Sequence, residues 1–287
     1  MQMNLRRVLA LMRKSMTKSV GLVLEGGGVK GAYELGALIA LTEKGYSFHA
    51  VTGTSIGALN GAVMASQGIE KLAEYWEEAK YCPVFDFDDD MVARFRQKDF
   101  DLDLIIAAGK KLLSAREIIR QSYEHTLKFV YDRLKEDEIR SSAIDFGCVT
   151  YNISDMEPFE AMKKDIPEGK LIDYIVASAC FPIFPPKQID GKKFIDGGVY
   201  DNMPINLLAR TGCRKMIVVR TNPVSKQPKR RIEQPDLDIF YITPSANLGR
   251  AMAFSPERIE NLKQLGYADA ARAIAEAEAA HSAAATD

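Results

Sequence analysis

The sequence has few of the residues that metal sites, disulfide frameworks and histidine-based catalysis require. Its 287 residues include only three histidines, and its four cysteines are far apart, with no Cys-X-X-Cys spacing. Because a zinc site needs clustered ligands, we expect no metal and no cofactor. The cysteines are predicted to be reduced thiols, mostly in apolar surroundings, as is usual in the cytoplasm. They are Cys82, Cys148, Cys180 and Cys213.

The chain also lacks an excess of charge of either sign. Its 38 basic and 39 acidic side chains give a formal net charge of −1, and 47% of its residues are hydrophobic. Such a balance creates no global field toward nucleic acid or an anionic membrane. We therefore expect a globular protein with a sizeable core and no nucleic-acid partner, in which any attraction to a membrane is local.

Residues 1–19 form a basic segment around a short apolar run. The run, Val8 to Met12, is too short to cross a bilayer, and no signal-peptide cleavage site follows it. As an amphipathic helix, the segment could lie on an anionic membrane; the alternative is a basic terminus that frays or packs without a membrane role. The expected location is therefore the cytoplasm, with peripheral contact at the inner membrane surface as an option. The cations are Arg6, Arg7, Arg13, Lys14 and Lys18.

Strands and helices are predicted to alternate along the chain. Two successive units have the order strand, glycine-rich loop, helix, with strands at 20–24 and 48–51 and helices at 32–44 and 58–66. This spacing indicates βαβ crossovers and a mainly parallel sheet of five or six strands with helices on both faces. Further strands are predicted at 144–151, 193–195, 216–219 and 238–242, and further helices at 69–80, 114–135 and 256–278.

No linker divides the chain, so one domain is predicted over residues 20–275. Residues 82–110 mix acidic residues with phenylalanines and have no clean period, which suggests either a lid or an ordinary helical insertion. The alanine-rich tail at 276–287 is expected to fray at its end.

A Gly-X-Ser-X-Gly pattern, Gly53 to Gly57, lies at the second junction between strand and helix. A sharp turn there can hold Ser55 in strained backbone geometry and expose its hydroxyl. The two glycines let strand and helix approach closely, and the helix that begins near Ile56 directs its dipole toward the site. The pattern predicts Ser55 as a nucleophile; the alternative is a plain tight turn.

A serine hydroxyl needs a base, usually a histidine, within hydrogen-bond reach. The three histidines are poorly placed: His49 lies in the strand before Ser55, His125 on a predicted surface helix and His281 in the tail. A carboxylate can replace histidine if partial burial raises its proton affinity. Asp196 ends a short strand before Gly197 and Gly198 and is the best candidate, although Asp201 competes with it and an Asp-Gly hairpin turn is an alternative.

The first glycine-rich loop, Gly26 to Gly31, follows a strand and opens a helix. Its backbone amides can converge on a developing oxyanion, and Lys30 can add positive field or hold the loop by an ion pair. Gly26, Gly28 and Gly31 also satisfy the dinucleotide fingerprint. That interpretation is weaker, because the fingerprint requires an acidic residue at the end of the second strand, where this sequence has Val51-Thr52-Gly53.

These three motifs, in this order, resemble the patatin-like phospholipase family. The resemblance extends over about residues 20–275 and includes the segment Ala177 to Pro186 and the stretch from Gly249 to Tyr267. It implies a three-layer α/β/α sandwich that cleaves fatty acyl esters of phospholipids or related lipids through a Ser55/Asp196 dyad. It also implies an oxyanion hole formed by Gly27 and Gly28, with help from Lys30. Phe181, Pro182, Phe184 and the aromatic residues of 85–100 could line an apolar acyl groove; the alternative is that these residues belong to the core.

Two other functions remain open at this point. One is a non-catalytic lipid-binding protein of the same fold, and the other is a dinucleotide-binding oxidoreductase. The substrate lipid, the ester position and the oligomeric state do not follow from the sequence.

Overall fold

The computed structural model describes residues 19–79, 120–121, 123–222 and 230–284. Residues 1–18 of the predicted basic segment and the whole of the predicted lid, 82–110, lie outside the described residues.

An eight-stranded mixed sheet forms the centre of the molecule, in the order β5-β6-β3-β2-β1-β7-β8, with β4 pairing with β3 beside this path. The strands β3, β2, β1, β7 and β8 run parallel, and β4, β5 and β6 pair antiparallel. The predicted α/β class and mainly parallel core are confirmed, whereas β4 and β5 were not predicted. The bounds are β1 Ser19–Leu24, β2 Ser47–Thr54, β3 Asp145–Asn152, β4 Glu157–Met162, β5 Lys187–Ile189, β6 Lys192–Asp196, β7 Lys215–Val219 and β8 Asp238–Ile242.

The described helices include the predicted crossovers, with several differences. The helices Glu136–Ser141, Leu171–Ser178 and Ile205–Ala209 were not predicted, and residues 114–119 of the helix predicted at 114–135 lie outside the described residues. The helices predicted at 58–66 and 69–80 form one element, α3, with a kink at Gly68, whose φ is 89°. The closing helix α9 runs on to Ala284, past the predicted end at residue 278. In the described part of the chain, no helix is both long and apolar enough to cross a bilayer. The bounds are α2 Gly31–Glu43, α3 Ile56–Ala79, α6 Glu136–Ser141, α7 Leu171–Ser178, α8 Ile205–Ala209 and α9 Pro256–Ala284, with 3-10 turns η1 Gly28–Lys30, η2 Lys163–Asp165 and η3 Gly197–Val199.

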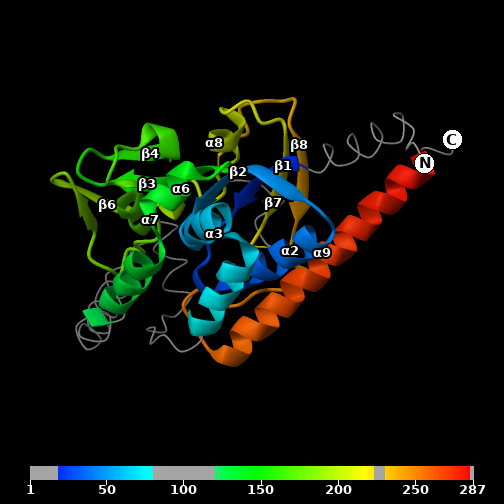
Figure 1. Ribbon diagram of the computed structural model, residues 1–287, viewed down its shortest axis with the longest axis horizontal. Coiled ribbons are helices and arrows are strands. Elements are labelled where there is room, and N and C mark those ends of the chain that lie inside the picture. Colours follow the sequence, from blue (N-terminus) through cyan, green and yellow to red (C-terminus); the bar gives the residue numbers. More distant parts are fainter. Residues whose placement is uncertain (1–18, 80–119, 122, 223–229, 285–287) are drawn as a thin grey trace, which may run out of the picture.

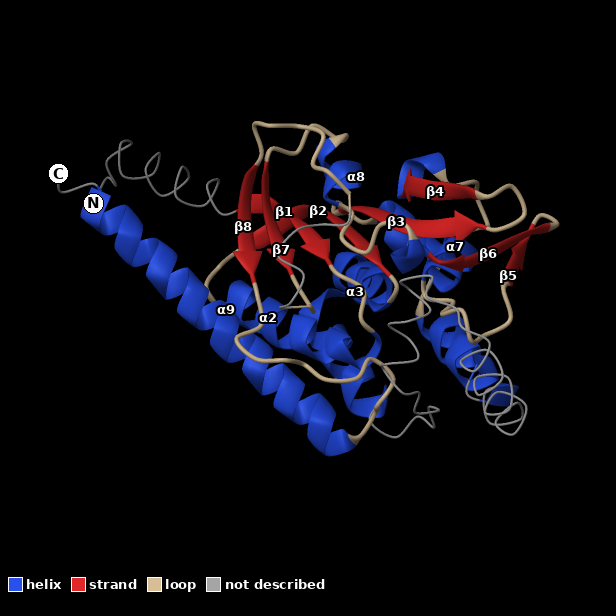
Figure 2. Cartoon of the chain, turned by 180° about the vertical axis from the view of Figure 1, so that it is seen from behind, coloured by secondary structure: helices blue, strands red, loops and turns tan. Residues whose placement is uncertain are grey.

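Helices cover both faces of the sheet (Figures 1 and 2). On one face, α2 and α3 pack against the strands, and α9 crosses the outside of α2. On the other face, α8 packs against β1 and β2. Each face of the sheet has its own hydrophobic core, and alternate residues of β1 point into one or the other. Leu22 and Leu24 belong to the larger core, and Val23 belongs to the core that contains Leu208 of α8.

The helix α2 is buried between the sheet and α9, and the two helices approach until their backbones touch. A Cβ atom added at Gly36 would lie 1.9 Å from the carbonyl oxygen of Lys263, and one added at Gly266 would lie 2.0 Å from that of Tyr33. The Tyr33 hydroxyl also donates a hydrogen bond of 3.1 Å to Asp269. Glycine is therefore required at both crossing positions.

This contact generates a prediction. Gly36→Ala should lower the free energy of unfolding by roughly 1 to 3 kcal/mol, because the added methyl group forces α9 away from α2. Urea denaturation measures the change, and Ala275→Ser on the exposed side of α9 serves as a control. In an exposed helix the Gly-to-Ala change stabilises by about 1 kcal/mol, so a variant more stable than wild type would contradict the close contact.

Candidate active site

Ser55 occupies the turn between β2 and α3 and has a φ of 58°, in the left-handed region that only a few per cent of non-glycine residues adopt. The flanking glycines make this turn possible. A Cβ atom at Gly53 would lie 2.3 Å from the carbonyl oxygen of Gly57, and one at Gly57 would lie 2.5 Å from that of Leu24. The turn is therefore held between main-chain segments, and Ser55 projects at the carboxyl end of β2.

The predicted nucleophile and base meet at this point. The Ser55 hydroxyl donates a hydrogen bond of 2.6 Å to Oδ2 of Asp196, although the two residues are 141 positions apart. Asp196 is 4% exposed, and its Oδ1 accepts a hydrogen bond of 2.7 Å from the amide of Gly198. The Ser55 amide donates to the hydroxyl of Ser178 at 3.0 Å. Both oxygens of the carboxylate are thus held by specific donors.

The sheet register explains why Asp196 arrives beside Ser55. Thr54 is the register partner of Val149 in β3, and Thr150 is the partner of Asp196 in β6. A Cβ atom at Gly197 would lie 2.1 Å from the carbonyl oxygen of Val149, so only glycine lets the chain turn so close to β3. The pairing of β6 with β3 therefore carries Asp196 into the site, and Gly197 allows the close turn that follows it.

The other candidate bases lie elsewhere. The carboxylate of Asp201 accepts from the amide of Met203 at 3.0 Å, and its backbone carbonyl accepts from the Thr54 hydroxyl at 2.9 Å. Burial raises the pKa of Asp201 to about 6. His49 and His125 have exposed side chains. Asp201 therefore braces the end of β2, and Asp196 is the carboxylate that touches the serine.

The glycine-rich loop is fastened against Ser55 at its first residue. The carbonyl oxygen of Gly26 accepts from the Asn202 side-chain amide at 2.8 Å and from the Thr221 hydroxyl at 2.9 Å. Its amide donates to the carbonyl of Asn202 at 3.1 Å. A Cβ atom at Gly26 would be 2.9 Å from Cβ of Ser55, so the loop and the serine are in direct contact. The sequence motifs did not reveal Asn202 or Thr221.

Beyond Gly26, the loop divides into amides that are bonded within the protein and amides that are not. The amide of Val29 donates to the carbonyl of Ala251 at 2.8 Å, that of Lys30 to Gly27, and that of Gly31 to Gly28. Among the described residues, the amides of Gly27 and Gly28 have no hydrogen-bond acceptor. These two N–H groups are therefore the ones available to an oxyanion.

The loop follows a buried carboxylate that sequence analysis did not identify. Oε2 of Glu25 accepts from the amides of Thr221 at 2.8 Å and Asn222 at 3.2 Å, and Nε of Arg220 lies 4.0 Å from it. Burial raises the pKa of Glu25, while the amide hydrogen bonds and Arg220 oppose that shift. Glu25 thus joins the end of β1 to the end of β7 directly before the loop.

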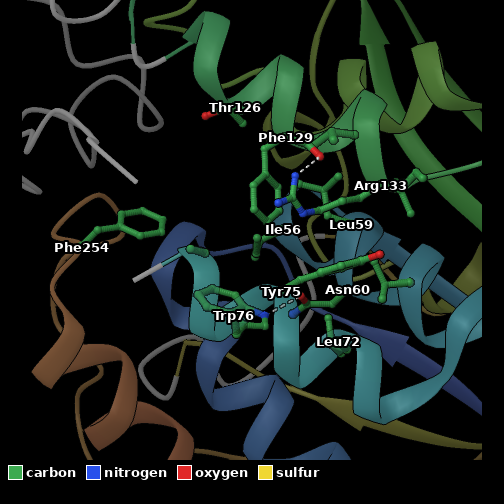
Figure 3. Close-up of a pocket in the computed structure, with 14 residues that line it drawn as sticks. Ile56, Leu59, Asn60, Leu72, Tyr75, Trp76, Thr126, Phe129, Arg133 and Phe254 are labelled. Carbon is green, nitrogen blue, oxygen red and sulfur yellow. Dashed lines mark hydrogen bonds between the residues drawn. The ribbon is translucent and has the colours of Figure 1, made fainter. Parts of the chain in front are cut away.

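An apolar cavity of about 150 Å³ opens beside Ile56, the residue after Ser55 (Figure 3). The Arg133 guanidinium lies over the ring of Phe129, 3.8 Å from its centroid. Phe181, Pro182 and Phe184, which were expected to line an acyl groove, are not among the described residues that line this cavity, and Phe184 stacks on Tyr123. The aromatic residues of 85–100 lie outside the described residues. The lining residues are Ile56, Leu59, Asn60, Val63, Leu72, Tyr75, Trp76, Ala79, Thr126, Phe129, Val130, Arg133, Leu134 and Phe254.

The three described cysteines, Cys148, Cys180 and Cys213, are buried free thiols, as predicted. The described side chains contain no cluster of three His, Cys, Asp or Glu residues that could hold a metal ion. The space next to Gly28, which a dinucleotide-binding loop keeps open for pyrophosphate, is filled by Ala251, whose carbonyl oxygen would lie 2.3 Å from an added Cβ atom.

Comparisons with known proteins identify the family of the chain. Residues 22–209 match the profile of the patatin-like phospholipases. The chain is 29% identical to lysophospholipase NTE1 of Mycosarcoma maydis over 224 residues, covering 77% of this chain and 10% of that protein. It is 25% identical to an uncharacterized NTE family protein of Mycobacterium bovis over 222 residues, covering 77% and 54%. The chain therefore corresponds to only part of the length of these relatives.

Among solved structures, VipD of Legionella pneumophila superimposes with a TM-score of 0.50 at 16% identity. The match covers 90% of this chain and 67% of that one, and it establishes a shared fold. The family profile extends from β1 through α8 and contains the glycine-rich loop, Ser55 and Asp196. The chain belongs to the patatin-like phospholipase family.

Proposed function

We propose that this protein is a serine acyl hydrolase that cleaves fatty acyl esters of phospholipids or lysophospholipids through a Ser55/Asp196 dyad. The observation that carries the proposal is the 2.6 Å hydrogen bond from Ser55 to a buried carboxylate, beside a loop with two N–H donors that have no acceptor in the described residues. Family membership and the name lysophospholipase borne by a relative support a lipid ester as the substrate.

In the first half of the reaction, the Ser55 oxygen attacks the ester carbonyl carbon and its proton passes to Oδ2 of Asp196. The carbonyl oxygen becomes an oxyanion, which the amides of Gly27 and Gly28 stabilise. Removal of one such donor typically costs roughly 3 to 4 kcal/mol of barrier lowering. As the tetrahedral intermediate collapses, the ester C–O bond breaks and Asp196 returns the proton to the leaving alcohol.

In the second half, water attacks the acyl-enzyme and Asp196 takes one of its protons. The second tetrahedral intermediate collapses, the fatty acid departs and Ser55 recovers its proton. The Gly198 amide holds the other carboxylate oxygen at 2.7 Å, so Asp196 keeps the same orientation in both halves.

The cavity beside Ile56 is the proposed site of the acyl chain. Its lining is almost entirely apolar and includes Ile56, the residue that follows the nucleophile. An ester whose carbonyl carbon contacts Ser55 can therefore extend its hydrocarbon chain between α3 and the helical residues 123–133. Removing that chain from water supplies the binding energy, at about 0.8 kcal/mol for each buried methylene.

Replacing either member of the dyad should abolish hydrolysis. Ser55→Ala and Asp196→Asn should each lower kcat by about 10⁴-fold or more toward p-nitrophenyl esters and lysophosphatidylcholine. Circular dichroism checks that both variants are folded. An active Asp196→Asn enzyme beside an inactive Ser55→Ala enzyme would place the base elsewhere. A wild-type protein that binds lipid but hydrolyses no ester would favour a lipid-binding protein of the same fold.

Asp201→Asn is the matched control, since Asp201 is also buried and lies five residues from Asp196. We expect near-normal kcat. Because burial raises the pKa of Asp201 to about 6, the folded protein binds its proton more tightly than the unfolded chain, and wild-type stability falls as pH rises from about 4 to 6. The variant should therefore melt at a higher temperature than wild type at pH 8 and show no such gain at pH 4. The same difference at both pH values would contradict this assignment.

Filling the cavity should shorten the preferred acyl chain. Leu59→Trp places a larger side chain in the lining and should lower kcat/KM for p-nitrophenyl decanoate by 10-fold or more, with little effect on the acetate, since about 1 to 3 kcal/mol of pocket binding is lost. Leu265→Trp, a partly buried position on α9 outside the cavity, is the control. An unchanged preference in Leu59→Trp would show that the acyl chain binds elsewhere.

A further inference from the structure

A buried polar cluster joins three parts of the site that the proposed mechanism treats separately. At its centre is Asn60 of α3, which is 2% exposed. The Asn60 amide nitrogen donates to the carbonyl oxygen of Gly31 at 3.0 Å and to Oε2 of Glu34 at 2.8 Å. The Asn60 oxygen accepts from the indole N–H of Trp76 at 2.9 Å. One side chain thus connects the end of the glycine-rich loop, the nucleophile helix and the cavity wall.

The packing around Gly31 shows how tightly these parts are held. A Cβ atom added at Gly31 would lie 2.4 Å from Ile56, 2.9 Å from the Asn60 nitrogen and 2.9 Å from the Trp76 ring. Because Gly31 lacks a side chain, the start of α2 rests directly on the first turn of α3 and on the cavity wall. A displacement of Trp76 is therefore transmitted to Gly31 through van der Waals contact as well as through Asn60.

The cluster also contains the buried carboxyl group of Glu34. Glu34 is fully buried, and burial raises its pKa well above the usual range, with Asn60 opposing the shift. Its other oxygen, Oε1, has no hydrogen-bond partner among the described residues. Burial therefore favours the protonated carboxylic acid of Glu34, the form that adds no negative charge beside the oxyanion donors of the neighbouring loop.

The cluster lies between the cavity proposed for the acyl chain and the loop proposed to stabilise the oxyanion. Asn60 and Trp76 both line the cavity, where Figure 3 shows them hydrogen-bonded to each other on one wall. Gly31 lies three residues after Gly28, one of the two amides available to the oxyanion, and its amide donates to the Gly28 carbonyl. Misplacement of catalytic donors by about 1 Å can cost roughly 100-fold in rate.

We propose that Asn60 is a positioning residue through which an acyl chain in the cavity, by contact with Trp76, sets the oxyanion donors of the glycine-rich loop. The inference rests on the proposed function and adds a source of substrate selectivity to it. Part of the binding energy of the hydrocarbon chain then stabilises the transition state, because it keeps the oxyanion donors in position. A longer chain therefore raises kcat as well as lowering KM. A short ester leaves the cavity empty and gains nothing from Asn60.

The test compares p-nitrophenyl decanoate with p-nitrophenyl acetate. In wild type, kcat for the decanoate should exceed that for the acetate. Asn60→Leu should reduce this ratio by roughly 10- to 100-fold, through a loss of decanoate kcat with little change in KM. Trp76→Phe, which removes one hydrogen bond of the cluster, should reduce the ratio less. The double variant should be no worse than Asn60→Leu alone, because both act through one contact.

Asn206→Leu is the matched control. Asn206 is 3% exposed, on α8 across the sheet. Within the described residues its side chain bonds only backbone groups, donating to the carbonyl of Arg231 and accepting from the amide of Glu233. We expect lower stability in this variant but an unchanged decanoate-to-acetate ratio. Equal losses of kcat for both esters in Asn60→Leu, or no loss for either, would overturn the proposal. Wild type inactive on both esters would refute the proposed function itself.

A second measurement does not depend on turnover. Trp76 is the single tryptophan of the chain, so intrinsic fluorescence reports on the cavity wall alone. Titration of Ser55→Ala with decanoic acid should shift the emission, and adding Asn60→Leu should change the emission of the ligand-free protein, because the indole loses its acceptor. If decanoic acid leaves the emission unchanged, the cavity does not hold the acyl chain and the coupling is refuted, whatever the esterase result.

Discussion

Main chain packs directly on main chain at the carboxyl edge of the sheet, and the meeting of Ser55 with Asp196 depends on that contact. At Gly53, Gly57 and Gly197, an added Cβ atom would fall between 2.1 and 2.5 Å from a backbone carbonyl oxygen. No side chain larger than hydrogen fits there without moving a strand. These glycines set the separation of β2, β3 and β6, and the 2.6 Å hydrogen bond follows from it.

A second set of contacts fixes the glycine-rich loop relative to the same edge. Asn202 and Thr221 converge on Gly26, while Glu25 bonds two consecutive backbone amides after β7. Each bond is between buried or half-buried groups, so leaving one partner unpaired would cost about 1 to 3 kcal/mol. These contacts hold Glu25 and Gly26, the start of the loop, independently of substrate, and the amides of Gly27 and Gly28 follow directly after this fixed point.

The sequence was sufficient for the features that depend on local pattern. The strand, loop and helix around Gly26 and around Ser55 were predicted because glycine clusters and apolar runs mark them. The pairing of Ser55 with Asp196 was predicted from the scarcity of histidine and from the family resemblance. The structure brings these two side chains together, while their catalytic roles remain to be tested by substitution.

Other parts of the fold and site leave little local signal. The strands β4 and β5 and the helix α8 are short, and their sequences have no clean period. Asn202, Thr221 and Asn60 act across 29 to 195 residues of sequence, and an isolated polar residue gives no indication of its distant partner. The cavity beside Ile56 left no local signal for the same reason, since its lining combines α3 with helical residues 123–133 and with Phe254.

The hydrogen bond from Val29 to Ala251 also bears on when the glycine-rich loop takes its final arrangement during synthesis. Ala251 and Thr221 both lie beyond residues 22–209, the part of the chain that matches the family profile. A nascent chain that has already emerged with Ser55, Asp196 and most of the sheet still lacks Thr221 and Ala251, two of the residues that hold the loop. Since domains generally fold as units as they leave the ribosome, the loop reaches its final arrangement only after residue 251 has been translated. Residues outside the family profile therefore complete a site whose motifs all lie within it.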